Sequence, residues 1–316
     1  MSSVWVYAEV HDGELDPAAL EILTKARELG EASAIVLGAG ATEAAAKLGE
    51  YGAATVFASD DSVYDDYIAQ PHAHALAELI AQHNPDLVLF ANNYDSRDIA
   101  GRLSGKTGST LMGNAIGLHS VDTAQTTIFG GAELVDVELE GTPKLVLVRP
   151  KSFEPSPSGG SATVVPVEVD LPDEVKKAKR VERHEEAASG PKLDAASVVV
   201  SGGRGLQEPD NFKMLEDLAT LLGGAVGATR AVVDAGWVPY SMQIGQTGIT
   251  VKPGVYIAVG ISGATQHMVG MKGAKKIIAI NKDEEAPIFS IADIGVVGDA
   301  LKIVPQLIEE VKNRKG

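Results

Sequence analysis

The sequence predicts an α/β protein with two doubly wound, Rossmann-like domains, the second of them an open parallel sheet. Three observations predict this class. Short apolar runs alternate with segments of helical length, as βαβ units require. Glycine-rich turns follow several of these runs, and the 316 residues include 34 glycines. Hydrophobic residues make up 45% of the chain and aromatic residues only 5%, so each half can bury an aliphatic core.

The first half is predicted to hold a largely parallel sheet. Asp16 and Pro17 are typical of the N-cap and first position of a helix. In chain order, we expect strands at 4–10, 34–37, 54–58 and 86–91, and helices at 16–29, 42–51 and 72–83. From Thr126 to Asp170, short strands separated by Gly and Pro turns predict an antiparallel extension that closes the first domain.

A charged stretch at 171–192 is predicted to connect the two domains, because it has little to bury and ends in Ser-Gly-Pro. The alternative is an exposed helix within a single domain. We therefore expect domains at 1–190 and 191–316. In the second, we expect strands at 197–201, 255–259 and 277–280 and helices at 209–222 and 301–311. The first of these helices carries an apolar stripe of Phe212, Leu215, Leu218 and Leu222.

Composition and charge exclude several classes of function. A formal net charge of −16 makes nucleic acid and anionic lipid improbable partners. The absence of cysteine excludes disulfides, iron–sulfur clusters and a thiol nucleophile, so redox chemistry would belong to an organic cofactor. No apolar run approaches the ~18 residues of a spanning helix. The first ten residues run directly into a strand pattern, so we expect a cytoplasmic protein that is not membrane-embedded.

The turn at Gly38–Gly40 lies where a dinucleotide fingerprint would lie, between a strand and a helix. Glu43 replaces the third glycine of that fingerprint. A carboxylate there would oppose a pyrophosphate and crowd the contact between helix and strand. We therefore interpret this turn as a tight βα connection and expect no nucleotide site in the first domain.

Three segments of the second domain could bind a ligand. Arg204 lies in the turn Ser-Gly-Gly-Arg-Gly, but such turns occur in most α/β proteins. Arg230 stands in an apolar, glycine-rich run, where it either needs an anionic or aromatic partner or is partly exposed. Residues 243–248 (QIGQTG) could present amides and hydroxyls to a polar ring or could form a simple β-turn.

A further cluster is predicted at the carboxyl ends of later strands, where open α/β sheets bind ligands. Ser262 is a plausible N-cap of a short helix, and His267 lies in its first turn. A lone histidine is more often structural than functional. Asn281 ends the next strand and Asp299 lies in a later turn, so both are also candidates.

The stretch 256–281, YIAVGISGATQHMVGMKGAKKIIAIN, resembles the signature of electron transfer flavoprotein α subunits. The resemblance extends through SGGRGL, TRAVVDAGW, QIGQTG, NKDEEAPIF and IADIGVVGD, and so covers essentially all of 197–316. The first domain matches more loosely, through NNYDSRDIAGRLSGKTGSTLMGNAIGL and an Arg-Pro-Lys-x-Phe sequence at Arg149. Thr265 is a departure, because the family usually has an aliphatic residue there.

This resemblance implies a heterodimer with an electron transfer flavoprotein β subunit, which pairs with the first domain and carries AMP. It implies one FAD in the second domain, electrons accepted from acyl-CoA-type dehydrogenases, and delivery to a quinone oxidoreductase at the membrane. It implies an electron carrier without a substrate or metal of its own. The implied FAD contacts are Arg204, Thr229, Arg230, Ile244, Gly245, Gln246, Thr247, Ser262, Gly263, Ala264, Thr265, Gln266, His267, Asn281, Asp299 and Ala300.

The resemblance also implies a role for each part of that set. Arg230 and Thr247 would flank the isoalloxazine, and His267 would face its N1 and C2-carbonyl edge. Ser262 and the amides after it would face ribityl or pyrophosphate oxygens, and Asn281 and Asp299 would lie toward the adenosine. Positive charge near a flavin that gains an electron raises its potential, and Arg230 and His267 suit this. With no acidic residue before Asp234, we expect the reduced flavin to be the counter-charge of Arg230.

Three other functions stay open. An NAD-dependent oxidoreductase could use a related open α/β domain, and a bound yellow chromophore would distinguish the two. A scaffold subunit with an empty site is disfavoured by the polar groups at the strand ends. Within the resembling family, the heterodimer is either a shuttle or a bifurcating type that takes hydride from NADH.

Overall fold

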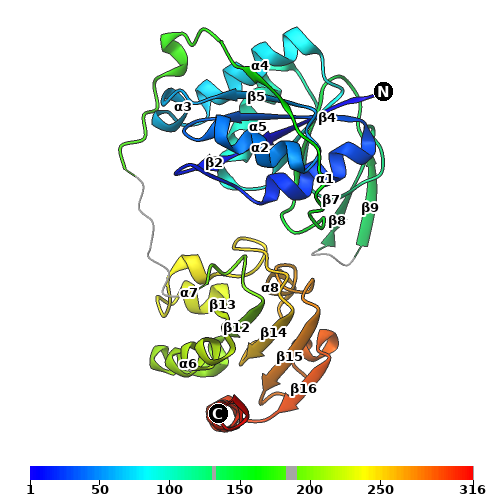
Figure 1. Cartoon of the computed structure of the whole chain (residues 1–316). Helices are drawn as coiled ribbons and strands as arrows, with labels where there is room; N and C mark the ends of the chain where they lie inside the picture. Colours follow the sequence, from blue (N-terminus) through cyan, green and yellow to red (C-terminus); the bar gives the residue numbers. More distant parts are fainter. Residues whose placement is uncertain (130–132, 183–190, 316) are drawn as a thin grey trace. The chain divides into compact units, whose positions relative to one another are not determined.

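The computed structural model describes residues 1–129, 133–182 and 191–315 (Figure 1). The chain divides into two compact units, Met1–Arg183 and His184–Gly316. The boundary that the sequence predicts at residue 190 lies at the edge of a stretch outside the described residues, and it stays a prediction. Among the described helices, none combines the length and apolarity needed to cross a membrane.

The first unit contains a sheet whose described strands run in the order β11-β5-β4-β1-β6-β10-β7-β8-β9. A small hairpin, β2 (Val10–His11) with β3 (Glu14–Leu15), follows β1. The strands of the large sheet are β1 (Ser3–Ala8), β4 (Glu31–Leu37), β5 (Thr55–Ser59), β6 (Leu87–Ala91), β7 (Leu111–Leu118), β8 (Thr123–Ile128), β9 (Glu133–Glu138), β10 (Lys144–Val148) and β11 (Thr163–Pro166).

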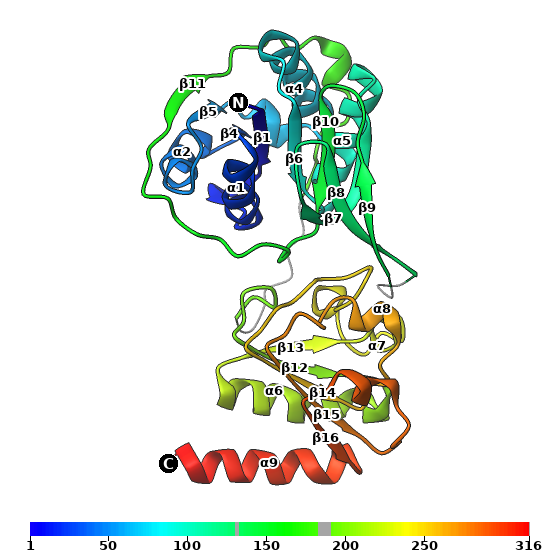
Figure 2. The same cartoon turned by 90° about the vertical axis from the view of Figure 1, so that its right-hand side faces the viewer.

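Helices cover both faces of this sheet, so its central strands are apolar at nearly every position. Helices α1 (Ala18–Leu29) and α2 (Ala41–Glu50) pack over one face, together with Val4 and Val6 of β1 (Figure 2). Helices α4 (Gln70–His83) and α5 (Tyr94–Thr107) pack over the other face with Trp5 and Tyr7. Successive side chains of β1 thus pack alternately into two separate hydrophobic cores, one on each face of the sheet.

The predicted antiparallel extension at 126–170 is wrong for half of its strands. Only β8 and β9 extend the sheet in antiparallel fashion. Strand β10 lies between β6 and β7 and is parallel to both, while β11 is parallel to β5 at the opposite edge. Every residue of β10 is buried, as expected of a strand with a neighbouring strand on each side. The sequence of β10 is a nearly continuous apolar run, which is typical of a buried strand, but the Gly and Pro turns around it favoured the antiparallel prediction.

Helix boundaries in the first unit also differ from the sequence prediction. The Asp16 carboxylate does accept from the Ala18 amide at 2.9 Å, but α1 begins two residues later than expected. Helices α3 (Val63–Asp66) and α5 were not predicted. The α5 segment is rich in Gly, Ser and charge, so its helical pattern is weak. Its start is fixed by Asn93, whose side chain accepts from the Ser96 amide at 2.9 Å.

The first part of the predicted connector packs along the first unit. It contains a short 3₁₀ turn, Asp173–Val175, and is then hydrogen-bonded to the α3–α4 loop. The Ile68 amide donates to the Ala178 carbonyl at 2.9 Å, and the Arg180 amide to the Asp66 carbonyl at 2.7 Å. Among the described residues of this stretch, the 3₁₀ turn is the only helical segment, so they do not form the one exposed helix of the alternative.

The second unit is an open, parallel sheet with the order β13-β12-β14-β15-β16. Helices α6 and α9 cover one face, where Phe212, Leu215 and Leu218 are buried as the predicted stripe requires. The elements are β12 (Val198–Gly202), α6 (Phe212–Leu222), β13 (Ala225–Ala228), α7 (Arg230–Val233), β14 (Val255–Val259), α8 (Thr265–Met268), β15 (Lys276–Asn281), β16 (Ile294–Val297) and α9 (Ala300–Lys315), with 3₁₀ turns at Arg204–Leu206, Pro209–Asn211, Tyr240–Met242 and Pro287–Ile291.

Both sheets are doubly wound from their first strand. In the first unit, β1 lies between β4 and β6, and in the second, β12 lies between β13 and β14. The chain therefore reverses its winding direction between β1 and β6, and again between β12 and β14. Such switch points open a crevice at the carboxyl ends of the strands, where open α/β sheets hold ligands.

Candidate functional site

A pocket of about 670 Å³ lies in the second unit at the carboxyl ends of β12 and β14. It occupies the switch point of that sheet, and its volume is typical of a site for a large organic ligand. Most of the residues predicted as FAD contacts line it. They are Arg204, Thr229, Arg230, Ile244, Gly245, Gln246, Thr247, Ser262, Ala264, Gln266, His267 and Asn281.

Four predicted contacts are not among the lining residues. Gly263 packs against the backbone of the 3₁₀ turn at 287–291, where an added Cβ would lie 2.2 Å from the Ile288 amide nitrogen. Thr265 is exposed at the start of α8. The Asp299 carboxylate accepts from the Leu301 amide at 3.0 Å, so it caps α9, and Ala300 is buried beneath that helix start. Gly263, Asp299 and Ala300 therefore support the fold around the pocket.

Other lining residues were not singled out from the sequence. They are Gly203, Gly205, Ala231, Asp234, Gly260, Ile261 and Asp283. The glycines lay inside motifs that were recognised as a whole, so only their polar neighbours were chosen. Asp234 and Asp283 carried no local signal, because isolated exposed carboxylates are common.

Glycines bring the loops after β12 and β14 into backbone contact. The Gly205 amide donates to the Gly260 carbonyl at 2.9 Å. An added Cβ at Gly203 would lie 2.5 Å from the Gly260 oxygen, and one at Gly205 would lie 2.6 Å from the Gly260 Cα. Gly260 itself has a φ of 62°, which glycine adopts readily. The glycine-rich turn is therefore required mainly for the packing of two loops that form the pocket wall.

Arg230 has a partner within the chain, contrary to the prediction. It begins α7, and its Nε donates to the Asp234 carboxylate at 3.1 Å, one helical turn away. The two side chains are 67% and 61% exposed, so the pair contributes little to stability. Because the guanidinium is solvated rather than buried, its environment does not require a ligand. It nevertheless lines the pocket, and it can turn toward an anion there.

The loop 243–248 closes on itself and on α8. The Ile249 amide donates to the Gln243 carbonyl at 2.7 Å, and the Gln246 amide to the Gln266 carbonyl at 2.7 Å. The buried Gln243 side chain donates to the Thr247 hydroxyl at 3.0 Å. The sequence offered either a simple turn or a loop that presents amides and hydroxyls to a ligand. Each describes part of the structure, because a tight turn places Gln246 and Thr247 on the pocket wall.

His267 is buried at the base of the pocket. Its Nδ1 lies 3.0 Å from the Ile244 carbonyl oxygen, and its Nε2 lies 2.9 Å from the Tyr256 hydroxyl. Burial lowers the pKa of His267 to about 4, and the hydrogen bond to Ile244 opposes this shift. Burial also raises the pKa of Tyr256 well above its usual value. Both groups are therefore neutral at physiological pH.

Two further predicted contacts differ in their local role. Ser262 is not the N-cap of α8, because Ala264 occupies that position without a side-chain cap. Instead, the Ser262 carbonyl accepts from the Ile288 amide at 3.0 Å. Asn281 donates to the Ile261 carbonyl at 2.9 Å and accepts from the Asp283 amide at 3.0 Å. Asn281 thus holds the loop after β14 against the loop after β15.

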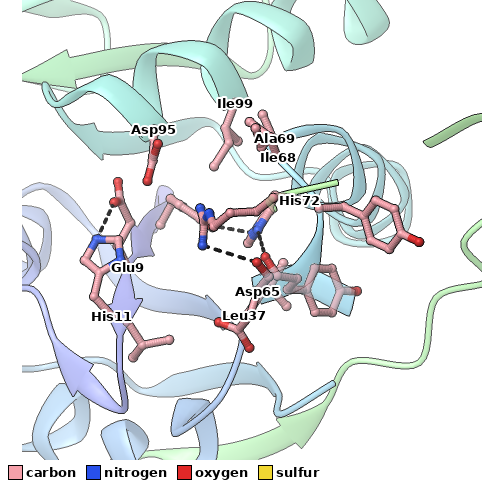
Figure 3. A pocket seen from close by; sticks show the side chains of 14 residues that line it. Glu9, His11, Leu37, Asp65, Ile68, Ala69, His72, Asp95 and Ile99 are labelled. Carbon is pink, nitrogen blue, oxygen red and sulfur yellow. Dashed lines mark hydrogen bonds and ion pairs between the residues drawn. The ribbon is translucent and has the colours of Figure 1, made fainter. Parts of the chain in front are cut away.

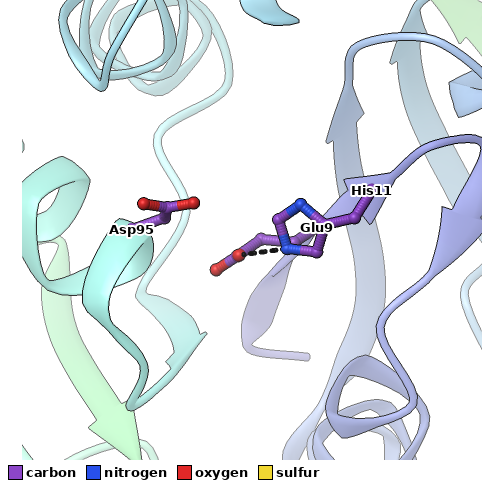
Figure 4. A group of neighbouring side chains, drawn as sticks. All are labelled: Glu9, His11 and Asp95. Carbon is purple, nitrogen blue, oxygen red and sulfur yellow. Dashed lines mark hydrogen bonds and ion pairs between the residues drawn. The ribbon is translucent and has the colours of Figure 1, made fainter. Parts of the chain in front are cut away.

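A small pocket of about 40 Å³ lies at the switch point of the first unit (Figure 3). Glu9 lies there, close to His11 and opposite Asp95 (Figure 4). The Glu9 carboxylate accepts from Asn93 at 2.9 Å, from the Ser96 hydroxyl, and lies 3.1 Å from the His11 ring nitrogen. Despite burial, these hydrogen bonds lower the pKa of Glu9. The carboxylate thus ties β1 to the start of α5.

The Gly38–Gly40 turn is likewise engaged by the protein itself. The Ala39 amide donates to Asp65 at 2.8 Å, and the Thr42 amide donates to Asp60 at 3.1 Å. Carboxylates therefore occupy the place that phosphate oxygens take in a dinucleotide site. An added Cβ at Gly40 would lie 2.9 Å from the Gly13 Cα, so this glycine permits a close backbone approach.

Two family profiles and several full-length relatives all relate this chain to electron transfer flavoproteins. Two family profiles match the chain, one described as the electron transfer flavoprotein domain over residues 4–174 and one as the electron transfer flavoprotein FAD-binding domain over residues 192–272. The chain is 42% identical to an electron transfer flavoprotein subunit alpha of Mycobacterium leprae, and each covers 100% of the other. It is 43% identical to the protein of the same name in Mycobacterium tuberculosis, again over both full lengths. It is 35% identical to Protein FixB of Clostridium saccharobutylicum, over 98% of this chain and 96% of that protein.

Proposed function

The chain belongs to the family of electron transfer flavoprotein α subunits, and on that premise we propose that it binds one FAD in the pocket between β12 and β14. Members of this family are flavin-bound electron carriers that pair with a β subunit. The observation that supports the position is that three features coincide: the 670 Å³ pocket, the switch point of the second sheet, and the predicted contacts at 204, 229–230, 244–247, 262, 264 and 266–267.

The chemistry of the lining residues fits a flavin dinucleotide. Arg204 and Arg230 supply exposed cations for anionic groups of the ligand. Thr247, Gln246 and Ser262 supply hydroxyl and amide groups, and Ile244 and Ile261 supply apolar surface. When bound, FAD supplies the ability to accept and release single electrons. The residues of this chain orient the ring system, shield it from water and set the local charge.

We assign parts of the ligand to parts of the pocket. Arg230 and Thr247 flank the isoalloxazine, and Ser262 with the following amides faces the ribityl and pyrophosphate oxygens. Asn281 lies toward the adenosine. Asp299 and Ala300 support that end indirectly, through the start of α9, since neither lines the pocket.

We place the heterodimer between flavin dehydrogenases of the acyl-CoA type and a membrane quinone oxidoreductase, with AMP on the β subunit. Support comes from the family and from the absence, among the described residues that line the pocket, of a nucleophile paired with a general base. A bifurcating heterodimer, which takes hydride from NADH, would carry a second flavin on the β subunit. The two types therefore differ in the number of flavins per heterodimer.

The test is co-purification with the β subunit, followed by a count of flavin and AMP per heterodimer. A shuttle gives one FAD and one AMP, whereas a bifurcating heterodimer gives two FAD and no AMP. A colourless heterodimer that takes up nicotinamide dinucleotide instead of FAD would overturn the proposal. Denatured protein should release its flavin as FAD rather than FMN, since the pocket also has room for the adenosine part.

A further inference from the structure

His267 differs from the other ionisable residues that line the pocket. Arg204, Arg230, Asp234 and Asp283 are exposed, whereas His267 is only 6% exposed. An exposed charge is screened by water, while a buried charge would act strongly on a neighbouring ligand. The protonation state of this one imidazole therefore determines much of the local electrostatic field.

The polarity of two hydrogen bonds determines which tautomer the neutral ring adopts. A backbone carbonyl can only accept, so the Nδ1 atom, 3.0 Å from the Ile244 oxygen, carries the proton. A neutral imidazole then has its lone pair on Nε2. The Tyr256 hydroxyl, 2.9 Å away, is placed to donate to that lone pair. For a neutral ring, the two contacts are mutually consistent only with the proton on Nδ1, and burial, which lowers the pKa of His267, disfavours the doubly protonated ring.

The acceptor on the Nδ1 side is held in a fixed place. The Ile244 amide donates to the Ala228 carbonyl of β13 at 2.9 Å, which anchors the loop to the sheet. Gly245 packs so closely on α8 that an added Cβ would lie 2.7 Å from the Gln266 oxygen. On the other side, Tyr256 is fully buried in β14. The ring therefore lies between two partners that have little freedom to move.

We propose that Tyr256 is a positioning residue, which holds His267 in its neutral form with the proton on Nδ1, so that His267 presents no positive charge to the pocket. Tyr256 does not touch the pocket itself and acts through the imidazole. The consequence for a flavin rests on the function proposed above. In that case, the cationic groups around the ligand are the exposed arginines, and both ring nitrogens of His267 are already engaged by the protein.

This assignment changes the role that the sequence resemblance implied for His267. A histidine that carries charge would favour a reduced flavin in a pH-dependent way. A neutral His267 keeps the field of the pocket constant across physiological pH. Protonation would make Nε2 a donor to the Tyr256 hydroxyl oxygen, so the hydroxyl proton would have to turn away from the ring, toward Ser201, and burial would disfavour the added charge.

The test uses the heterodimer with ¹⁵N-labelled histidine and two-bond ¹H–¹⁵N correlation spectra, which distinguish the two tautomers and the imidazolium. His267→Gln identifies the His267 signals among the seven histidines. We expect the wild-type ring to be neutral with its proton on Nδ1 from pH 8 to pH 5.5. Tyr256→Phe removes the donor to Nε2, and we expect the tautomer ratio to shift at least about fivefold toward Nε2–H, the effect of one hydrogen bond.

Tyr94→Phe, a change at an exposed tyrosine of the first unit, is the matched control and should leave the His267 signals unchanged. An imidazolium or an Nε2–H ring in the wild type at pH 7 would overturn the proposal, as would an unchanged ratio in folded Tyr256→Phe. If that variant does not fold, the wild-type spectrum alone decides. Flavin absorbance of the same wild-type sample is read separately, so a missing flavin refutes the FAD site without affecting the tautomer result.

Discussion

The two units have the same kind of crevice and use it in opposite ways. Each sheet reverses its winding next to its first strand, which is where α/β proteins bind ligands. In the first unit, Glu9, Asn93 and Ser96 fill this crevice with a hydrogen-bonded network. In the second, Gly203, Gly205 and Gly260 occupy the corresponding place, and a pocket of about 670 Å³ remains.

This difference shows that a glycine-rich turn does not by itself identify a site. The turn at Gly38–Gly40 has the backbone of an anion-binding loop, but Asp60 and Asp65 accept from its amides. In the turn at Gly203–Gly205, the Gly205 amide donates to the Gly260 carbonyl, yet this turn borders the open pocket. What distinguishes the two is whether side chains of the chain itself already satisfy the polar groups and fill the space.

The family resemblance implies that the first unit pairs with the β subunit, and we propose that the second unit binds the cofactor. This division of roles predicts a large effect when the partner is absent. Ile128 on β8 and Leu134 on β9 are large apolar side chains that are exposed in the first unit, and so is Phe129, which follows β8. We expect the chain produced without its β subunit to aggregate or to lose most of its flavin, because obligate interfaces are apolar. Light scattering and flavin absorbance measure this. A stable monomer with one tightly bound FAD would contradict the assignment.

A matched pair of glycine substitutions tests which crevice matters for the flavin. Both Gly40→Ala and Gly260→Ala place a Cβ within 3 Å of backbone atoms at a positive φ, so each should cost about 2–4 kcal/mol of stability. We expect Gly260→Ala to lose flavin as well, because the pocket wall must shift. Gly40→Ala should keep the wild-type ratio of flavin to folded protein. Flavin loss in soluble, folded Gly40→Ala would refute the division of roles.

Acid should destabilise the second unit through His267. Its pKa is about 4 in the folded chain, against an ordinary value of about 6.5, so the unfolded chain binds the proton more tightly. The stability that the neutral ring contributes is present above pH 6.5 and is lost as the pH falls toward 4. The total is on the order of 3 kcal/mol. Denaturant unfolding of wild type and His267→Gln between pH 7 and 4.5 should show a steeper decline for the wild type.

The smallest expected effects are shifts of the flavin potential on substitution of Arg230 and His267. Because the Arg230 guanidinium is 67% exposed and paired with Asp234, its removal should change the flavin environment by only about 0.5–1 kcal/mol. We therefore expect Arg230→Ala to lower the first one-electron potential by roughly 20–40 mV, and Asp234→Asn to raise it. Reductive titration of both FAD-loaded variants measures the shifts. An unshifted potential in Arg230→Ala would show that Arg230 has no such role, and His267→Ala should have a weaker effect.

The sequence predicted the α/β class and most of the residues that line the pocket, because short apolar strands and turn motifs are local signals. Contacts between residues that are far apart in the sequence were harder to predict. Strand β10 is parallel and central because the sheet needs a buried strand beside β6, and no local pattern reports its neighbours. The partner of Arg230 was overlooked because Asp234 lies one helical turn away in a segment not predicted as helix. The two partners of His267 come from Ile244 and Tyr256, which only the folded chain brings together.

Hydrogen–deuterium exchange of the heterodimer, with and without FAD, tests most directly whether the pocket of the second unit alone holds the flavin contacts of this chain. FAD should slow exchange in the segments 203–205, 229–234, 244–247, 260–267 and 281–283, which contain the residues that line the pocket. It should leave exchange at 9–11, 38–42 and 93–96 unchanged, because the groups of that crevice are engaged by the protein itself. Protection of the first crevice on FAD binding, with none around the pocket, would contradict the account.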